Sequence, residues 1–283
     1  MLEVLKAIVY GIVEGITEWL PVSSTGHLIL VEQLLPFEGT SENFFGMFDV
    51  VIQLGAILAV VILFWKQIWP FALSKKEREG KTGIMSFIKP DIMTLWFKIL
   101  VSCVPAAVIG VLFDEVFEAL FYNPVCISIA LIVFGIAFII IENWNKERTA
   151  KVNSLSEITY QTALLIGFFQ LIAAIFPGTS RSGATIVGAL IIGVSRTVAA
   201  EYTFFLAIPV MFGASLLKVV KFGFGFTAQE LMLLLIGTLV SFLVSMVVLR
   251  FLMGYIKKHD FKVFGWYRII LGIIVLAAFG IFF

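Results

Sequence analysis

Residues 14–27 read EGITEWLPVSSTGH, a polar segment that lies between two apolar stretches of the chain. Its proline, its glycines and the three consecutive hydroxyl residues Ser23 to Thr25 interrupt a helical pattern. A second such segment, PGTSRSG at 177–183, interrupts a later apolar region. Polar, helix-breaking segments inside apolar sequence predict a helical membrane protein whose chemistry lies at these two breaks.

The composition indicates that lipid is the main solvent. The chain has 283 residues, of which 60% are hydrophobic and 14% charged, and 29 of them are phenylalanine. Soluble domains carry about 25% charged residues, so this chain has too few charges to cover a water-facing surface. The formal net charge of +1 gives no electrostatic basis for binding nucleic acid.

Six apolar stretches are long enough to cross a bilayer, which takes about 20 residues. Two further apolar regions, 4–35 and 158–193, are each divided by a polar segment into halves that are too short to span. Backbone groups freed inside a membrane must face protein or water. We therefore expect an all-α membrane protein with six transmembrane helices and two re-entrant helix–loop–helix hairpins. The expected spans are 47–69, 92–113, 124–143, 199–221, 228–252 and 265–283.

The two divided regions match each other in position and residue type. Each copy precedes three expected spans, an odd number, so the second copy must enter from the opposite face. This predicts an inverted-topology repeat within a single domain, 1–283, with repeat 1 at about 1–143 and repeat 2 at about 158–283. The matches are Ala7 with Ala163, Gly11 with Gly167, Glu14 with Gln170, Pro21 with Pro177, Ser23 with Thr179 and Ser24 with Ser180.

Basic residues in short loops mark the cytoplasmic side of a membrane protein. They gather in the loops 74–91, 144–157 and 253–264, whereas residues 7–65 contain none and the expected loop 114–123 has only acidic charges. With six spans the three basic loops share one side, so the first hairpin enters from outside and the second from the cytoplasm. Lys218 and Lys221, near an expected outer end, run against this assignment. The basic loop residues are Lys75, Lys76, Arg78, Lys81, Lys89, Lys146, Arg148, Lys151, Lys257, Lys258 and Lys262.

Glu14 and Glu18 are four residues apart and therefore share one helix face. An ionisable residue inside a membrane segment is costly and by default marks a functional site. Two carboxylates on one face could bind a divalent cation, act as a general base or share a proton. The alternative, a pair that extends to water at a helix end, is weakened by the mid-helix position of Glu14.

Ser23, Ser24 and Thr25 precede a new apolar helix at 28–35, where the free N–H groups of a helix start form an anion site. An N-cap accounts for one hydroxyl, but not for three beside a glycine and His27. A hydroxyl next to His27 is a candidate nucleophile, and His27 is a candidate general acid. A purely structural histidine is the alternative.

Arg181 is the only basic residue in the second polar segment, and Ser180 and Ser182 flank it. Its planar guanidinium matches a phosphate or a carboxylate in a bidentate manner. The structural alternative is a salt bridge to Glu14 or Glu18 across the repeat interface, and both roles are compatible. Gln53, polar inside an expected span, either donates to the site or links two helices.

Together the two segments supply two helix N-termini, a guanidinium, several hydroxyls, two carboxylates and one imidazole. This set suits a phosphate ester or anhydride, and the two carboxylates need a cation to coexist with such an anion. A lipid flippase or anion transporter that uses the same midplane pocket is the alternative, because inverted repeats with broken helices are common in carriers.

At both segments the chain resembles the bacitracin-resistance family of undecaprenyl-diphosphate phosphatases. The likeness covers essentially the whole chain, and Thr179 fills a variable position of the second motif. The family's EGxTE…PVSSTGH pattern is matched by Glu14, Gly15, Thr17, Glu18 and residues 21–27, and its PGxSRSGATI pattern by Pro177, Gly178 and residues 180–186.

The resemblance implies a hydrolase of the bacterial inner membrane that converts undecaprenyl diphosphate to the monophosphate and so recycles a lipid carrier for peptidoglycan synthesis. It also implies bacitracin resistance, a site that opens to the outer face, and dependence on a divalent cation, Mg²⁺ or Ca²⁺, held near Glu14 and Glu18. A homodimer is left open. The expected catalytic residues are Glu14, Glu18, Ser24, His27 and Arg181, and the expected substrate-binding residues are Ser23, Thr25, Gln53, Thr179, Ser180 and Ser182.

Overall fold

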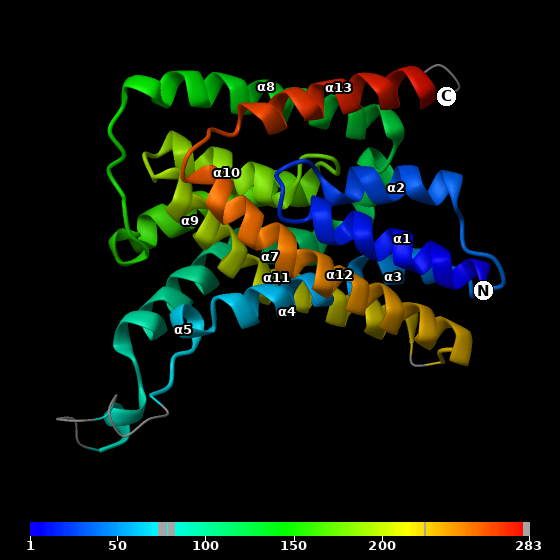
Figure 1. Cartoon of the computed structure of the whole chain (residues 1–283), viewed down its shortest axis with the longest axis horizontal. Coiled ribbons are helices and arrows are strands. Elements are labelled where there is room, and N and C mark those ends of the chain that lie inside the picture. The colour runs from blue at the N-terminus through cyan, green and yellow to red at the C-terminus, as the bar shows by residue number, and fades with distance from the viewer. Residues whose placement is uncertain (73–77, 79–82, 224, 280–283) are drawn as a thin grey trace.

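The computed structural model describes residues 1–72, 78, 83–223 and 225–279, and these residues form helices joined by short loops (Figure 1). Two isolated β-bridges, Phe71 with Ile88 and Val152 with Val194, are the strand-like contacts among them. The predicted all-α class is confirmed. Three of the predicted cytoplasmic lysines, Lys75, Lys76 and Lys81, lie outside the described residues.

Within the described residues, five helical segments are long and apolar enough to cross a membrane. They correspond to the first five expected spans. The sixth expected span, 265–283, is represented by the shorter helix α13, Lys262–Phe279, which is not one of the five. The five are α3 with α4 (Phe44–Val51 and Gln53–Leu63), α7 (Pro90–Phe121), α8 (Pro124–Trp144), α11 (Arg196–Phe222) and α12 (Ala228–Ile256).

The expected loop 114–123 is wrong for most of its length, because α7 continues as a helix to Phe121. Residues 115–120 read EVFEAL, and glutamate, alanine and leucine are strong helix formers. Most of the segment between the second and third expected spans therefore belongs to the last turns of a long helix. Four shorter elements complete the fold: α5 (Trp65–Ile68), η1 (Ile84–Phe87), η2 (Asn145–Glu147) and η3 (Leu155–Glu157).

The first divided region forms α1, Leu2–Thr17, and α2, Ser24–Leu34, and the chain turns back between them (Figure 1). The Lys6 ammonium donates to the carbonyl oxygen of Pro36 at 2.6 Å, and the Tyr10 hydroxyl donates to that of Leu35 at 3.0 Å. The end of α2 therefore lies beside the start of α1, as a hairpin requires.

The second divided region repeats this arrangement with α9, Tyr160–Ile175, and α10, Arg181–Ile191. The Lys151 amide donates to the carbonyl oxygen of Gly193 at 2.8 Å, and the Ser195 amide donates to that of Val152 at 2.9 Å. The chain thus leaves the second hairpin at the place where it entered, and both loops lie at the far ends of their hairpins.

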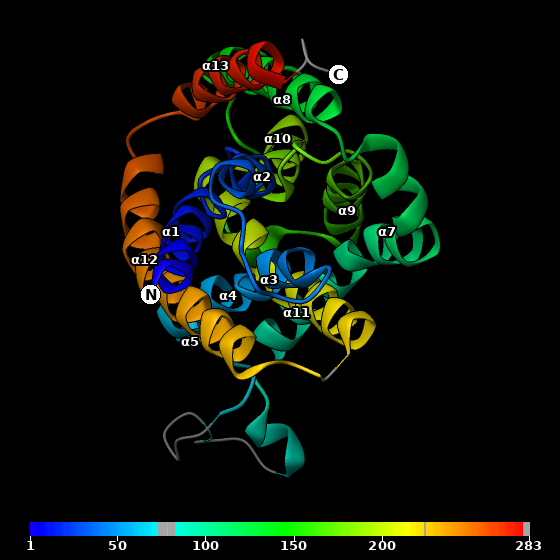
Figure 2. The same ribbon diagram turned by 90° about the vertical axis from the view of Figure 1, so that its right-hand side faces the viewer.

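Each hairpin packs against a long helix from the other half of the chain. The first hairpin's α1 packs on α12, the second hairpin's α9 packs on α7, and α8 packs on α13 (Figure 2). Glycines allow these close approaches: a Cβ at Gly11 would meet the carbonyl oxygen of Gly237, and one at Gly167 would meet that of Ser102. The two halves are interleaved rather than stacked as separate bodies.

The interior and the surface have the character of a membrane protein. In α10 every residue from Ser182 to Leu190 is buried. By contrast, the long helices expose large apolar side chains, such as Val247 (68% exposed) and Phe251 (60%) on α12. Contiguous apolar surface of this kind fits lipid rather than water. The chain is a multi-pass membrane protein.

The contact between α4 and α12 supports a test of this packing. A Cβ at Gly55 would lie 2.0 Å from the carbonyl oxygen of Thr238, whereas nothing lies within 4 Å of a Cβ at Gly213. We expect Gly55→Ala to lower the free energy of unfolding by about 1–3 kcal/mol, the typical cost of overpacking. Gly213→Ala, the matched control on a lipid-facing position, should leave it unchanged or slightly raised. Thermal unfolding in detergent measures both, and equal midpoints for the two variants would contradict the packing.

Candidate active site

The two hairpin loops end in the same local structure. Ser23 and Ser180 are the N-caps of α2 and α10, with φ angles of 77° and 68° that non-glycine residues rarely adopt. Their hydroxyl oxygens accept from the amides of Gly26, at 3.3 Å, and Gly183, at 3.1 Å. Strained backbone of this kind clusters at functional sites. The caps pair Ser23 with Ser180, one residue away from the match made by sequence.

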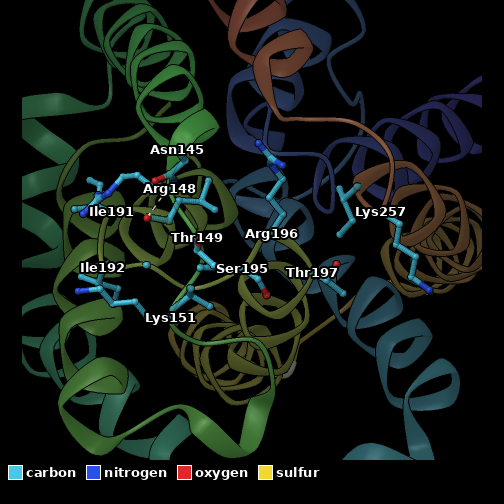
Figure 3. Close-up of a pocket in the computed structure, with 15 residues that line it drawn as sticks. Asn145, Arg148, Thr149, Lys151, Ile191, Ile192, Ser195, Arg196, Thr197 and Lys257 are labelled. Atoms are coloured by element: carbon cyan, nitrogen blue, oxygen red, sulfur yellow. Dashed lines mark hydrogen bonds between the residues drawn. The ribbon is translucent and has the colours of Figure 1, made fainter.

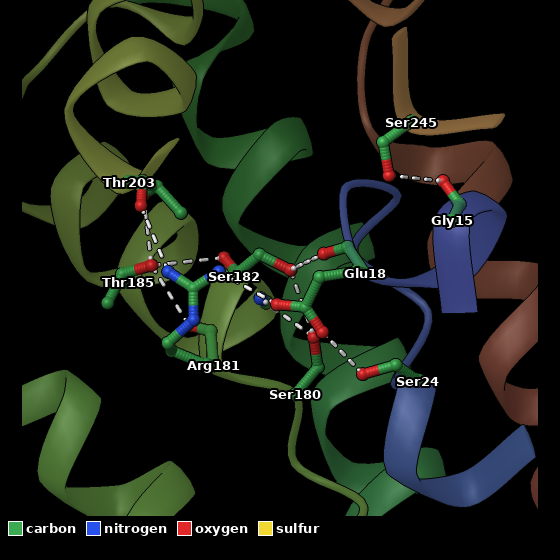
Figure 4. Close-up of polar contacts among 10 residues, drawn as sticks. Gly15, Glu18, Ser24, Ser180, Arg181, Ser182, Thr185, Thr203 and Ser245 are labelled. Carbon is green, nitrogen blue, oxygen red and sulfur yellow. Dashed lines mark hydrogen bonds and ion pairs between the residues drawn. The ribbon is translucent and has the colours of Figure 1, made fainter. Parts of the chain in front are cut away.

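An ion pair joins the two loops (Figure 4). Nη2 of Arg181, at the start of α10, lies 2.8 Å from Oε1 of Glu18, directly after α1. The Ser24 hydroxyl donates to the other carboxylate oxygen, Oε2, at 2.6 Å. The Glu18 side chain is 7% exposed and the Arg181 side chain 13%. The salt bridge that was considered as the structural alternative for Arg181 is present, with Glu18 rather than Glu14 as the partner.

Hydrogen bonds fix the orientation of Arg181. Its Nη1 donates to the carbonyl oxygen of Thr203 at 3.0 Å, and the Thr185 hydroxyl donates to the carbonyl oxygen of Arg181 itself at 2.9 Å. The hydroxyls of Thr185 and Thr203 lie 2.9 Å apart (Figure 4). The Ser182 hydroxyl donates to the carbonyl oxygen of Glu18 at 3.3 Å. A guanidinium held on both sides is preorganised for an anion.

Glu14 lies on α1, one helical turn before Glu18, and the Glu18 amide donates to its carbonyl oxygen at 3.0 Å. Its carboxylate is fully buried, and neither oxygen has a hydrogen-bond partner among the described residues. A buried carboxylate without a partner is costly as an anion, so it must take up either a proton or a cation.

A cavity of about 290 Å³ opens at the ion pair. Six of the predicted site residues line it: Glu18, Ser24, Thr25, Gln53, Ser180 and Arg181. Three further polar residues that were not predicted also line it: Asp49, Tyr122 and Lys218.

The other predicted site residues lie around the cavity without lining it. Ser23 caps α2, and Ser182 bonds to Ser180 at 3.1 Å as well as to Glu18. The Thr179 side chain is buried, and its hydroxyl has no partner among the described residues. These residues support the loops rather than face the space that a substrate would enter.

His27 points toward α13. Its Nδ1 lies 2.7 Å from the carbonyl oxygen of Ser23, and its Nε2 lies 2.7 Å from the hydroxyl of Tyr267. The histidine and tyrosine rings are stacked, with centroids 5.6 Å apart. Ser24 therefore has Glu18 as its partner in this structure, and the imidazole does not contact that hydroxyl.

Sequence reasoning did not identify Tyr267 and Arg268 on α13, or Lys218 on α11. Arg268 is fully buried and contacts both loops. A signal for it existed, because a cation inside an expected span is costly unless it has a role. Lys218 was an exception to the rule that basic residues lie on the cytoplasmic side. Its position in the lining of the cavity accounts for that exception.

A larger cavity of about 590 Å³ lies at the opposite ends of these helices. Arg148, Lys151, Arg196 and Lys257 line it, but Figure 3 shows their charged groups pointing away from one another. Arg196 is already paired with the buried carboxylate of Glu142. Because its cations do not converge, this cavity is a weaker candidate for phosphate chemistry than the one at Arg181.

Comparison with known proteins agrees with the motifs. The family model "Bacitracin resistance protein BacA" matches residues 7–274. The chain is 63% identical over 280 residues to the undecaprenyl-diphosphatase of Desulfitobacterium hafniense (strain DSM 10664 / DCB-2), covering 99% of this chain and 97% of the relative. It is 61% identical to undecaprenyl-diphosphatase 1 of Clostridium acetobutylicum, covering 98% of each, and 58% identical to the undecaprenyl-diphosphatase of Enterococcus faecalis, covering 97% and 96%. The chain therefore belongs to the bacitracin resistance protein BacA family.

Proposed function

We propose that this chain is a membrane phosphatase that hydrolyses undecaprenyl diphosphate to undecaprenyl phosphate and inorganic phosphate at the cavity between the two loops. The relatives described above are named for this activity, and the chain matches them over nearly their full length. One observation carries the assignment of the site: a buried guanidinium, a carboxylate and a hydroxyl meet at one cavity. The product returns to the pool of lipid carrier for cell-wall synthesis, which accounts for bacitracin resistance.

Arg181 binds the diphosphate in this mechanism. The free amides at the starts of α2 and α10 add partial positive charge, which stabilises the negative charge that develops on the leaving phosphate. The terminal phosphorus is attacked by an oxygen whose proton passes to Glu18, the carboxylate that accepts from Ser24 at 2.6 Å. Two nucleophiles fit this geometry. A water molecule held by Ser24 would give inorganic phosphate directly, whereas Ser24 Oγ would first take the phosphoryl group and a water molecule would then release it as inorganic phosphate.

His27 is the candidate general acid for the leaving oxygen. Its Nδ1 donates to the carbonyl oxygen of Ser23, so Nε2 is the ring nitrogen left for proton transfer. Nε2 is bonded to Tyr267 in this structure. There Nε2 accepts from the tyrosine hydroxyl and carries no hydrogen, so in the proposed reaction it first takes up a proton from water and then donates that proton to the leaving oxygen.

The acidic pair fits a divalent cation. Neither carboxylate oxygen of Glu14 has a hydrogen-bond partner among the described residues. Glu18, the C-cap of α1, follows one helical turn later, on the same face of the helix. No group of three or more histidine, cysteine, aspartate or glutamate side chains in the described residues is arranged to hold a metal. Mg²⁺ commonly binds one or two carboxylates and takes its other ligands from water and phosphate, so Glu14 and Glu18 suffice. Such an ion would neutralise charge on the diphosphate.

The topology proposed for the membrane has six spans, with α13 as the sixth, and both hairpins re-entrant. The interleaved packing supports an inverted repeat, because α1 on α12 and α9 on α7 are exchanged versions of one contact. If the basic loops lie on the cytoplasmic side of the inner membrane, the cavity at Arg181 opens toward the outer face. A homodimer stays a prediction. The comparisons give no support to the flippase or transporter alternative, because the relatives are named as diphosphatases.

The first test measures phosphate release from a polyprenyl diphosphate by the purified protein in detergent, where no gradient exists. We expect Glu18→Gln and Arg181→Ala to lower kcat by about 100-fold or more, the usual effect of losing a general base or a preorganised charge. Glu201→Gln and Arg148→Ala remove the same charges away from the site and serve as matched controls. Full activity in both site variants would refute the assignment, and no release by the wild type would refute the function.

The second test concerns the cation. Chelation with EDTA should abolish phosphate release, and added Mg²⁺ or Ca²⁺ should restore it. Glu14→Gln should raise the cation concentration needed for half-maximal activity, because an amide oxygen carries no charge. Activity that persists after chelation, with the metal content of the protein checked by mass spectrometry, would remove the cation from the proposal.

The third test concerns the topology. The two cysteines of the chain, Cys103 and Cys126, are free thiols and can be replaced by alanine. In that background Glu42→Cys lies on the proposed outer side and Glu147→Cys on the proposed cytoplasmic side, and both positions are exposed. A membrane-impermeant maleimide added to intact cells should label Glu42→Cys and spare Glu147→Cys until the cells are opened. The reverse pattern would invert the orientation, and labelling of both would contradict the span number.

A further inference from the structure

A single side chain on α13 contacts both hairpin loops. Nη1 of Arg268 donates to the carbonyl oxygen of Pro21 in the first loop at 3.2 Å. Its Nη2 donates to the carbonyl oxygens of Gly178, at 2.9 Å, and Thr179, at 2.7 Å, in the second loop. Three carbonyl groups that come from segments far apart in the sequence are thus held by one planar group.

Packing alone does not explain why an arginine is buried at position 268. The residue is fully buried. Its contacts in the described part of the chain are carbonyl oxygens and the Phe134 ring, whose centroid lies 5.9 Å from Cζ, rather than a carboxylate. Burial of a cation without a counter-ion is unfavourable. The space is also kept free for it, because a Cβ at Gly183 would lie 2.9 Å from Nη1 of Arg268.

The preceding residue, Tyr267, holds His27. A carbonyl oxygen can only accept, so His27 Nδ1 carries the hydrogen that is shared with Ser23. Nε2 is then an acceptor, and the Tyr267 hydroxyl donates to it at 2.7 Å. The stacked rings, with 5° between their planes, fix the direction of the imidazole as well as its tautomer.

The helix that carries both residues is itself anchored. Two glycines let α13 and α8 approach closely. A Cβ at Gly265 would meet the carbonyl oxygen of Gly135, and a Cβ at Gly135 would meet the carbonyl oxygen of Gly265. Close backbone packing of this kind leaves little freedom for sliding. Tyr267 and Arg268 therefore start from a fixed support.

We propose that α13 positions the active site, with Arg268 holding the two loops in register and Tyr267 holding the His27 ring in one orientation. The inference rests on the proposed phosphatase function. Glu18 and Arg181 belong to different hairpins, so their separation depends on how the loops sit relative to each other. A misplacement of about 1 Å can lower a rate by about 100-fold. Both α13 residues act through other groups and are positioning residues.

The experiment compares Arg268→Gln, Arg268→Lys and Tyr267→Phe with the wild type in the phosphate-release assay. We expect Arg268→Gln to lower kcat by about 100-fold with KM changed by less than about threefold, because alignment rather than ground-state binding is lost. Arg268→Lys, which keeps the charge and at least one donor, should recover part of kcat. Arg196→Gln, which breaks the ion pair with Glu142 at the other end of the bundle, is the control for stability loss without a change in kcat per folded molecule.

A double-mutant cycle tests Tyr267. Tyr267→Phe should lower kcat by about tenfold, the effect of losing one hydrogen bond. In a His27→Ala background the same change should have no further effect, because its target is gone. An additive loss would show that Tyr267 does not act through His27 and would overturn that half of the proposal.

Three results would contradict a positioning role for Arg268. They are a wild-type kcat in Arg268→Gln, a change in Arg268→Gln that affects KM alone, and a folded Arg268→Lys variant whose kcat is no higher than that of Arg268→Gln. If Arg268→Gln does not fold, as judged by size exclusion and thermal unfolding, the kcat and KM of Arg268→Lys decide the question. A wild type that releases no phosphate refutes the proposed function instead, so the two failures are distinguishable.

Discussion

The ion pair between Glu18 and Arg181 is the constraint on which the rest of the site depends. Its two members lie on different hairpins, and each is nearly buried. Removal of one partner from a buried pair typically costs about 3–5 kcal/mol, because the other charge is left without compensation. The loops must therefore meet. When they meet, Ser24 reaches the free oxygen of Glu18, and Arg181 reaches the carbonyl of Thr203.

The same ion pair explains how a strongly anionic substrate can enter a site that contains acids. Without substrate, the guanidinium is neutralised by Glu18. In the proposed mechanism a diphosphate competes for it, and the Glu18 carboxylate released from that pairing is free to accept the proton of the attacking oxygen. The structural and functional roles of Arg181, which sequence reasoning left side by side, are then two states of one interaction.

Much of this arrangement was predictable from local sequence, and the rest was not for definable reasons. The loops, their hydroxyls and Arg181 could be predicted because proline, glycine and polar residues stand out in an apolar chain. The partner of His27 could not, because Tyr267 lies 240 residues away and contacts it only in three dimensions. Arg268 was overlooked because it lies inside an apolar stretch that was treated as a span. The one-residue shift between Ser23 and Ser180 arises because the loops differ in length, which a fixed offset cannot accommodate.

Burial has different consequences at Glu14 and Gln170, the two positions that the sequence comparison matched. Both side chains are buried, and their polar atoms have no hydrogen-bond partner among the described residues. An unpaired amide is tolerated at moderate cost, but an unpaired carboxylate requires a proton or a cation. The first half of the chain therefore carries the two acids, and the second half carries a neutral amide and the arginine. Identical halves would bring together either two acidic pairs or two arginines at the meeting point, and neither set could be buried there without a large excess of one charge.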